Sequence, residues 1–345
     1  MNFNRRQLFT GGLGAIAVTL LNQTRASGQS RKPRRLKPGD RVGLCCPAGA
    51  VDSPEQVVIV EDAMRALGLV SVRGMHLLDR YGYLAGKDRD RAADVNQFFA
   101  DPDIALILPI TGGWGCARTL PYLDFELIRQ NPKILVGFSD VTALLLGIQA
   151  QTGLVTFHGP NGFSSWRSRQ TDWFKQVLFA GQQITWQQTP DPGDGDRLMQ
   201  VANRIQTIYP GTATGTLIGG NLSVLSAIVG TPFFPDTQGR ILFLEDIGEN
   251  IYRLDRMLTQ LKLAGILDDL NGFIFGQCQN CDPGSGFGSL TLMQVLEDHI
   301  KPLGIPAWLG APIGHVENIA TLPSGTTVAI DSQQGTITMT ETAVV

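Results

Sequence analysis

The segment around Ser139 has the residue types and spacing of a site for a serine nucleophile. The apolar run from Ile134 to Val136 predicts a buried strand, and the run from Val141 to Gln149 is compatible with a helix. A strand that turns directly into a helix at a serine presents the hydroxyl at the carboxyl end of a sheet, beside free N–H groups of the first helical turn. Ser139 or Asp140 could instead simply cap the helix, and this alternative stays open.

A nucleophilic serine also needs a base that takes its proton and a carboxylate that orients the base. Glu245 ends the apolar run that starts at Ile241, so it lies at the end of a predicted strand, where doubly wound folds place site residues. It could equally supply negative charge to the start of the helix predicted from Tyr252.

The chain has four histidines that could act as the base. His315 lies in a loop rich in glycine and proline, where an ordinary surface residue is the alternative. His299 falls within a predicted helix and His76 in a polar connection, whereas His158 precedes Gly-Pro and could lie near the site.

A turn at Gly112-Gly113-Trp114-Gly115 could help to stabilise an oxyanion, which needs two N–H donors aimed at one point. The Asp140 N–H is the natural first donor, and this turn, where glycines let the backbone approach a substrate, is the natural second. A loop that cradles phosphate is the competing interpretation, but no P-loop lysine or dinucleotide fingerprint surrounds the turn.

In the first half of the chain, predicted strands and helices alternate. The expected strands span 41–48, 69–73, 104–110 and 134–136, and the expected helices span 54–67, 87–99, 124–129 and 141–149. Strands that are apolar on both faces indicate a parallel sheet covered by helices. We therefore predict an N-terminal α/β domain over 36–165 that carries a strand–serine–helix elbow.

The pattern lapses over 166–203, which is polar and rich in turn residues and is interpreted as a linker. A C-terminal domain of mixed α+β type with a curled sheet is predicted for 204–345. Its expected strands span 215–218, 240–245 and 272–276, its helices 221–229, 252–263 and 290–300, and a closing hairpin spans 326–330 and 336–340.

The first 30 residues are predicted to form a twin-arginine signal segment. Arg5-Arg6 precede a short apolar run from Gly11 to Leu21, and small residues near Ala26 suit cleavage. Twin-arginine signals commonly have phenylalanine before leucine after the two arginines, whereas here Leu8 precedes Phe9. A retained amphipathic anchor is the alternative. The sequence therefore predicts export to the periplasm by the twin-arginine machinery.

Composition restricts the classes of partner and site. The 345-residue chain is 43% hydrophobic and 17% charged, with a net charge of −3, so no global basic field favours nucleic acid. Cys278 and Cys281 form a CxxC without a second pair at zinc spacing, which argues against a structural metal and leaves a local disulfide open.

Several ordered motifs together resemble the LD-carboxypeptidases, serine peptidases of the muramoyltetrapeptide carboxypeptidase and microcin-immunity type. The resemblance covers roughly Leu36 to Thr340. It is carried by Gly112–Gly115, Gly137–Asp140, Gly219-Gly220-Asn221-Leu222, Leu244–Glu249 with Tyr252, Asp255 and Arg256, and Gly314-His315. The family's usual Gly-Gly-Tyr-Gly carries Trp114 here, and its best-known members act in the cytoplasm, whereas this chain has a predicted export signal.

The resemblance implies a triad of Ser139 as nucleophile, His315 as base and Glu245 as orienting acid, in a cleft between the domains. It implies an oxyanion hole formed by the Gly113 and Asp140 N–H groups. It further implies a homodimer without metal or cofactor.

The implied reaction removes the terminal D-alanine from peptidoglycan stem tetrapeptides by cleaving the L,D-peptide bond. Hydrolysis of a peptidyl-nucleotide antibiotic and a catalytically silent wall-peptide-binding protein are the alternatives. Candidate substrate-binding residues are Trp114, Asn221 and Arg118. Asn221 could instead cap a helix, and Arg118 could be an ordinary surface residue.

Overall fold

The computed structural model describes residues 30–188, 198–200, 204–281 and 288–345. The predicted signal segment, residues 1–30, therefore lies outside the described residues except for its last position. Within the described ranges, no helix has both the length and the apolar character needed to cross a membrane.

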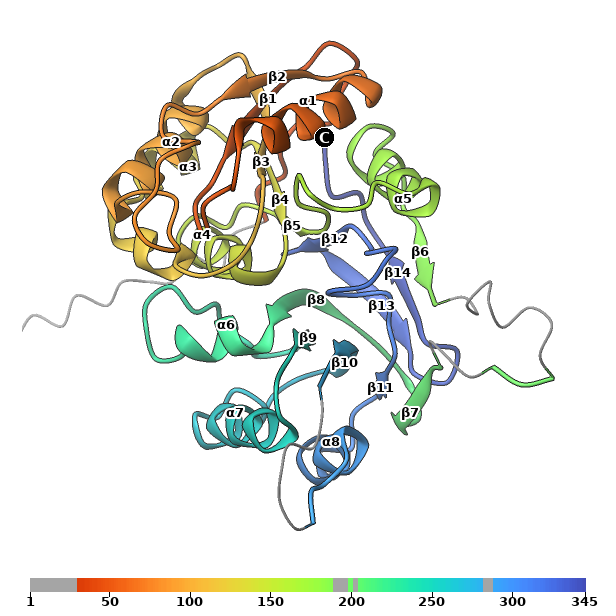
Figure 1. Ribbon diagram of the computed structural model, residues 1–345. Helices are drawn as coiled ribbons and strands as arrows, with labels where there is room; N and C mark the ends of the chain where they lie inside the picture. Colours follow the sequence, from red (N-terminus) through yellow and green to blue (C-terminus); the bar gives the residue numbers. More distant parts are fainter. Residues whose placement is uncertain (1–29, 189–197, 201–203, 282–287) are drawn as a thin grey trace, which may run out of the picture.

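The first half of the chain supplies five strands of a six-stranded sheet in the order β12-β5-β4-β3-β1-β2, and β12 comes from near the end of the chain (Figure 1). Its strands are β1 (Arg41–Cys45), β2 (Val70–Arg73), β3 (Ile104–Pro109), β4 (Ile134–Gly137), β5 (Thr156–His158) and β12 (Leu322–Ser324). All neighbouring strands are parallel except β12, which runs antiparallel to β5. The predicted parallel sheet is confirmed.

Helices cover both faces of this sheet because its central strands are apolar on both sides. The helices are α1 (Pro54–Ala66), α2 (Asp88–Ala100), α3 (Phe125–Gln130), α4 (Thr142–Thr152) and α5 (Ser168–Leu178). In β3, Leu106 and Leu108 belong to the core that also contains buried residues of α1 and α5, whereas Ile107 belongs to the core with α2 and α4. This alternation is the period of two that a buried strand imposes.

The second sheet has eight strands in the order β6-β14-β13-β8-β9-β10-β11-β7. The strands are β6 (Thr185–Gln187), β7 (Gln206–Tyr209), β8 (Thr212–Asn221), β9 (Arg240–Ile247), β10 (Gly272–Gln279), β11 (Ala307–Leu309), β13 (Thr327–Asp331) and β14 (Thr336–Met339). Strands β8 to β11 are parallel, and the outer strands pair antiparallel. The associated helices are α6 (Leu222–Ala227), α7 (Ile251–Leu263) and α8 (Leu292–Ile300). The mixed character predicted for this half is confirmed.

The segment predicted as a linker, 166–203, contains regular structure where it is described. Helix α5 buries Phe174, Val177 and Leu178, and β6 pairs with β14 of the second sheet. The sequence prediction missed both, although the buried apolar residues of α5 follow the i, i+3, i+4 spacing of a helix, whereas β6 is only three residues long. The turn-rich stretch 191–196 lies outside the described residues.

The end of the chain also departs from the predicted division. Strand β12 follows the second sheet in sequence but pairs with β5 of the first (Figure 1). It contains Pro323, which has no N–H to donate and is tolerated here because β12 is an edge strand. The Val345 N–H donates to Pro33 O at 3.0 Å, so the C-terminus joins the start of the described chain.

The two halves meet closely where α4 begins. The Asn221 N–H donates to Thr142 Oγ1 at 3.0 Å, which joins the end of β8 to the helix that follows Ser139. Gly220 has φ of 149°, and a Cβ built on it would lie 2.5 Å from two side-chain atoms of Thr142. Only glycine allows this approach.

Replacement of Gly220 by alanine should lower the free energy of unfolding by about 2 kcal/mol or more, because the added methyl group collides with Thr142. Gly230→Ala is the matched control, since Gly230 also has a positive φ but no atom near its Cβ position, and should cost only about 1 kcal/mol. Urea unfolding of both variants measures the difference. Equal losses would contradict the predicted contact.

Candidate active site

Ser139 lies at a sharp turn between β4 and the 3₁₀ turn η2 (Ser139–Val141), which leads into α4. Its φ is 61°, a conformation uncommon for residues other than glycine and one that costs about 1 to 3 kcal/mol. Its hydroxyl has no hydrogen-bond partner among the described residues, and neither η2 nor α4 has a side-chain cap. The alternative in which Ser139 is only a helix cap is therefore wrong.

Asp140 does not cap the helix either. Its Oδ2 accepts the Cys116 N–H at 2.7 Å, so it joins the elbow to the segment after the glycine turn. Burial raises the pKa of the Asp140 carboxyl, and the hydrogen bond from the Cys116 N–H opposes this rise. Asp140 thus has a structural contact that the sequence did not indicate, and its backbone N–H lies one residue beyond Ser139.

The glycine turn packs directly against the elbow. A Cβ built on Gly112 would lie 3.0 Å from Ser139 Oγ and 3.4 Å from the Asp140 nitrogen. Gly113 has φ of 113°, and its Cβ position would lie 3.3 Å from the Gly49 backbone. The two segments that the sequence predicted as sources of oxyanion donors are therefore brought side by side.

Glu245 and His315 form a hydrogen-bonded pair in the second half of the chain. Glu245 is fully buried near the end of β9, and His315 Nδ1 lies 2.8 Å from Glu245 Oε2. Because a carboxylate can only accept, Nδ1 carries the proton and the neutral ring presents Nε2 as an acceptor. The surface alternative for His315 does not hold, since its side chain is only 17% exposed.

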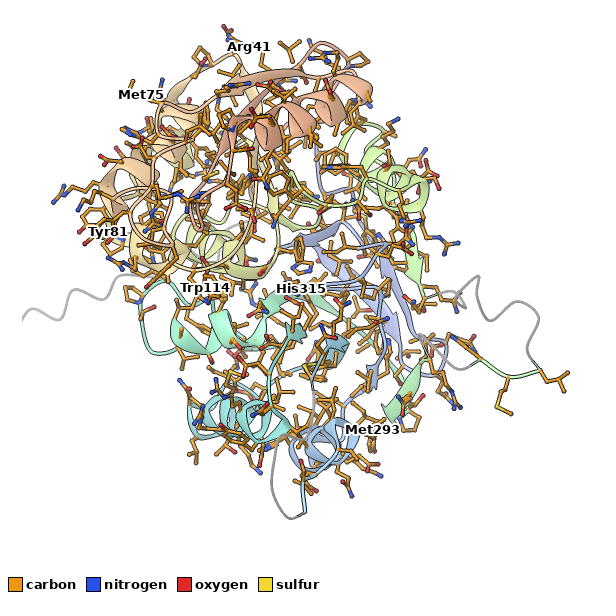
Figure 2. All side chains as sticks on the ribbon, in the orientation of Figure 1. Arg41, Met75, Tyr81, Trp114, Met293 and His315 are labelled. Carbon is orange, nitrogen blue, oxygen red and sulfur yellow. A yellow bond between two sulfur atoms is a disulfide. The ribbon has the colours of Figure 1, made fainter. Side chains whose placement is uncertain are left out.

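Phe138 links this pair to the elbow. Its ring packs edge-on against His315 with centroids 5.0 Å apart, and it immediately precedes Ser139. Figure 2 shows His315 and Trp114 at the level where the two halves of the molecule meet. The segment that carries Ser139 therefore lies beside the Glu245–His315 pair.

Asn221 caps α6, because its Oδ1 accepts the Val224 N–H at 3.1 Å. Its amide nitrogen donates to Asp246 Oδ1 at 3.1 Å, and Ser223 Oγ donates to Asp246 Oδ2 at 2.7 Å. The capping alternative is thus confirmed. Burial raises the pKa of the Asp246 carboxyl to about 6, against the opposing effect of the hydrogen bonds from Ser223 and the Ile247 N–H.

The other two predicted substrate-binding residues differ in their surroundings. Trp114 lies in the glycine turn and is 68% exposed, and its ring packs edge-on against Tyr83 at 6.0 Å between centroids. Arg118 donates from Nε and Nη2 to Asp88 Oδ2 at 3.1 and 3.0 Å, in an ion pair that is half-exposed. The guanidinium of Arg118 therefore already has a carboxylate partner.

His158 lies in the same region, although sequence reasoning gave it no role. It is fully buried at the end of β5, and its ring packs edge-on against Phe138 and Phe243. Burial lowers the pKa of His158 to about 4, against the attraction of the Glu245 carboxylate. Its position before Gly159-Pro160 was the only available signal.

The CxxC forms a disulfide between Cys278 and Cys281 at the end of β10. Cys278 is the register partner of Asp246 in the neighbouring strand β9. The disulfide that the sequence left open is therefore present, close to the end of the strand that carries Glu245.

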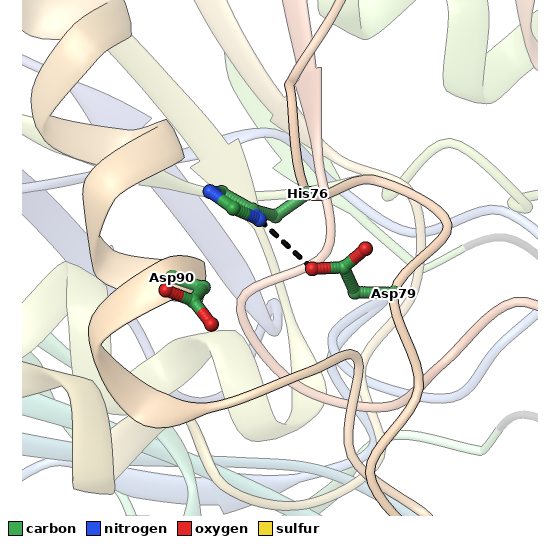
Figure 3. A group of neighbouring side chains, drawn as sticks. All are labelled: His76, Asp79 and Asp90. Atoms are coloured by element: carbon green, nitrogen blue, oxygen red, sulfur yellow. Dashed lines mark hydrogen bonds and ion pairs between the residues drawn. The ribbon is translucent and has the colours of Figure 1, made fainter.

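A cluster of potential metal ligands lies outside the candidate active site. His76, Asp79 and Asp90 offer ligand atoms that all lie within 4.8 Å of one another (Figure 3). His76 Nδ1 pairs with Asp79 Oδ2 at 2.8 Å. This hydrogen bond raises the pKa of the His76 imidazole, and the negative charge of nearby Asp94 adds to the rise. An ordinary histidine–aspartate ion pair accounts for the arrangement.

Comparisons with known proteins agree with this geometry. Residues 42–159 match the family model described as the LD-carboxypeptidase N-terminal domain, and residues 214–330 match the LD-carboxypeptidase C-terminal domain. The chain belongs to the LD-carboxypeptidase family. The resemblance inferred from the motifs is thereby confirmed.

Three relatives illustrate the range of this family. A Bacillus subtilis protein named "Probable murein peptide carboxypeptidase" is 39% identical over 310 residues, covering 88% of this chain and 93% of its own length. The microcin C7 self-immunity protein MccF of Escherichia coli is 32% identical over 75% of this chain and 80% of its own length. The crystal structure of a muramoyltetrapeptide carboxypeptidase from Oxalobacter formigenes has a TM-score of 0.73 at 26% identity, covering 87% of this chain and 97% of that chain.

The raised pKa of Asp246 predicts a specific dependence of stability on pH. The folded carboxyl retains its proton to a higher pH than the unfolded one, so the free energy of unfolding should fall as the pH rises from about 4 to 6. In Asp246→Asn this contribution, about 2 to 3 kcal/mol, should be absent. Urea unfolding at pH 4 and pH 7 measures it. Asp268→Asn, at an exposed site, is the charge-matched control and should keep the wild-type dependence.

Proposed function

We propose that this protein is a serine-type LD-carboxypeptidase that removes the terminal D-alanine from peptidoglycan stem tetrapeptides. The observation that carries the proposal is the hydrogen bond between buried Glu245 and His315, which lies beside the elbow that presents Ser139. Relatives named as murein peptide and muramoyltetrapeptide carboxypeptidases support the class of substrate.

In the proposed mechanism, Ser139 Oγ attacks the carbonyl carbon of the L,D-peptide bond and His315 Nε2 takes the hydroxyl proton. Glu245 holds the His315 ring in the tautomer with the proton on Nδ1 and stabilises the imidazolium that forms. The contact between Ser139 and His315 would tighten when substrate binds, as catalytic hydrogen bonds commonly do.

The tetrahedral intermediate would place its negative oxygen between the Asp140 and Gly113 N–H groups. His315 then returns its proton to the amine of the leaving D-alanine, which leaves the tripeptide esterified to Ser139. Water, activated by the same histidine, hydrolyses this ester and restores the serine. No step of this scheme needs a metal or cofactor.

For substrate binding, we propose that Trp114 forms one wall of the site, because it is exposed and adjoins a proposed oxyanion donor. Asn221 and Arg118 stay predictions. Each already has protein partners, which a substrate would have to share or displace. The homodimer implied by the family also stays a prediction.

A second candidate function is hydrolysis of a peptidyl-nucleotide antibiotic, which the similarity to the microcin C7 self-immunity protein MccF favours. Its solved structure has a TM-score of 0.81 at 28% identity, covering 91% of this chain. The silent binding protein is less favoured, because the strained conformation of Ser139 would then have no use.

Ser139→Ala should reduce release of D-alanine from a muramoyl tetrapeptide by about 10⁶-fold, because the nucleophile is removed while the fold is kept. Mass spectrometry of the products measures the loss of one alanine, and thermal melting checks folding. A parallel assay with an aminoacyl-sulfamoyl nucleoside separates the two candidate functions. Unchanged turnover in the variant would remove Ser139 from the mechanism.

We also propose that residues 1–30 direct export through the twin-arginine pathway. Fused to a reporter, they should deliver it to the periplasm, and replacement of Arg5 and Arg6 by lysine in the same fusion should stop export. Fractionation of cells measures the distribution. A wild-type fusion that stays in the cytoplasm would contradict the proposal.

A further inference from the structure

His158 and Glu245 lie together although they come from different sheets. The Phe243 ring packs against the His158 ring with centroids 5.1 Å apart. Glu245 follows Phe243 by two residues on β9, and side chains two apart on a strand point to the same face. Glu245 is therefore directed to the side of β9 on which His158 lies.

Both side chains have unused hydrogen-bonding atoms. Glu245 Oε2 accepts from His315, whereas Oε1 is buried and has no partner among the described residues. Both ring nitrogens of His158 are likewise buried without a partner in the described part of the chain. A buried carboxylate oxygen without a donor and a buried imidazole N–H without an acceptor are each unfavourable. The imidazole N–H of His158 is a donor that Glu245 Oε1 could accept.

Burial, more than the neighbouring charges, determines the protonation of His158. Burial lowers the pKa of His158 to about 4, against the Glu245 carboxylate, which raises it, and with a smaller lowering from His315. The ring is therefore neutral near pH 7 and carries one N–H. A neutral donor supports a buried carboxylate without neutralising the charge that His315 needs.

We propose that His158 is a positioning residue, which donates its ring N–H to Glu245 Oε1 in the substrate-bound enzyme, a bond that the described structure does not yet form, and so fixes the carboxylate that orients His315. The order of groups is then Ser139, His315, Glu245 and His158. Ser139 follows β4, and His158 ends the adjacent strand β5. This inference rests on the proposed function, because it assumes that Ser139 reacts through His315.

Two matched pairs of variants test the donor separately from the volume. His158→Asn and His158→Leu have similar shapes, and only asparagine keeps a donor near the Nδ1 position. His158→Gln and His158→Met also have similar shapes, and only glutamine keeps a donor near the Nε2 position. In one of these pairs, the amide variant should exceed its apolar partner in kcat/KM by roughly 10- to 100-fold, with KM little changed.

The pH profile provides a readout that a purely structural role would not move. Without a donor to Oε1, the Glu245–His315 pair takes up a proton more readily, so the acid limb of kcat/KM should move to higher pH in the apolar variants. Apolar variants as active as their amide partners in both pairs, with an unshifted acid limb, would overturn the inference.

The rate at which a fluorophosphonate labels Ser139 should be measured in every variant, because it does not depend on the peptide substrate. If the wild type is labelled but releases no D-alanine, the proposed substrate fails while the labelling rates still test His158. If Ser139 in the folded wild type is not labelled, the triad fails and the inference with it.

Discussion

The hydrogen bond between His315 and the fully buried Glu245 is the interaction on which the site depends. A buried carboxylate is stable only when partners compensate for its lost hydration, so the loop that carries His315 must lie close to the end of β9. Gly314 makes this approach feasible. Its φ is 93°, and a Cβ there would lie 2.3 Å from Glu245 Oε2. The fold of the second sheet thereby holds the His315 ring against Glu245.

The elbow provides the other half of the site under a different constraint. Ser139 is held at a positive φ because Ile134 to Val136 are buried in the sheet and α4 is buried immediately afterwards. The glycine turn then closes against it, fixed by the bond from the Cys116 N–H to Asp140. The strain at Ser139 is maintained by packing on both sides, as is common for strained residues at functional sites.

Contacts between the halves convert two partial sites into one. The Asn221–Thr142 bond, the Phe138–His315 ring contact and the close approach at Gly220 all lie within a few residues of Ser139 or Glu245. Strand β12 adds a further connection, because a segment that follows His315 pairs with β5 of the first sheet. The relative position of serine and histidine is thus set by several independent contacts.

Local sequence patterns predicted most of the regular elements, because apolar strands and amphipathic helices have a recognisable hydrophobic periodicity. They failed where pairing over long distances decides the structure. Strand β6 is only three residues long and is defined by β14, and β12 contains a proline and is defined by β5. No local signal separates such short segments from loops. Helix α5 is a different case, because Phe174, Val177 and Leu178 follow helical spacing and the prediction overlooked that pattern.

The sequence by itself indicated the family, through several ordered motifs, and the resemblance to that family named Ser139, Glu245 and His315 as the candidate triad. The tertiary structure decided which groups meet. It paired Nδ1 of His315 with Glu245, removed Ser139 and Asp140 from a capping role, and buried His158 beside Phe243. These outcomes depend on packing between segments far apart in the chain, which residue types and spacing do not encode locally.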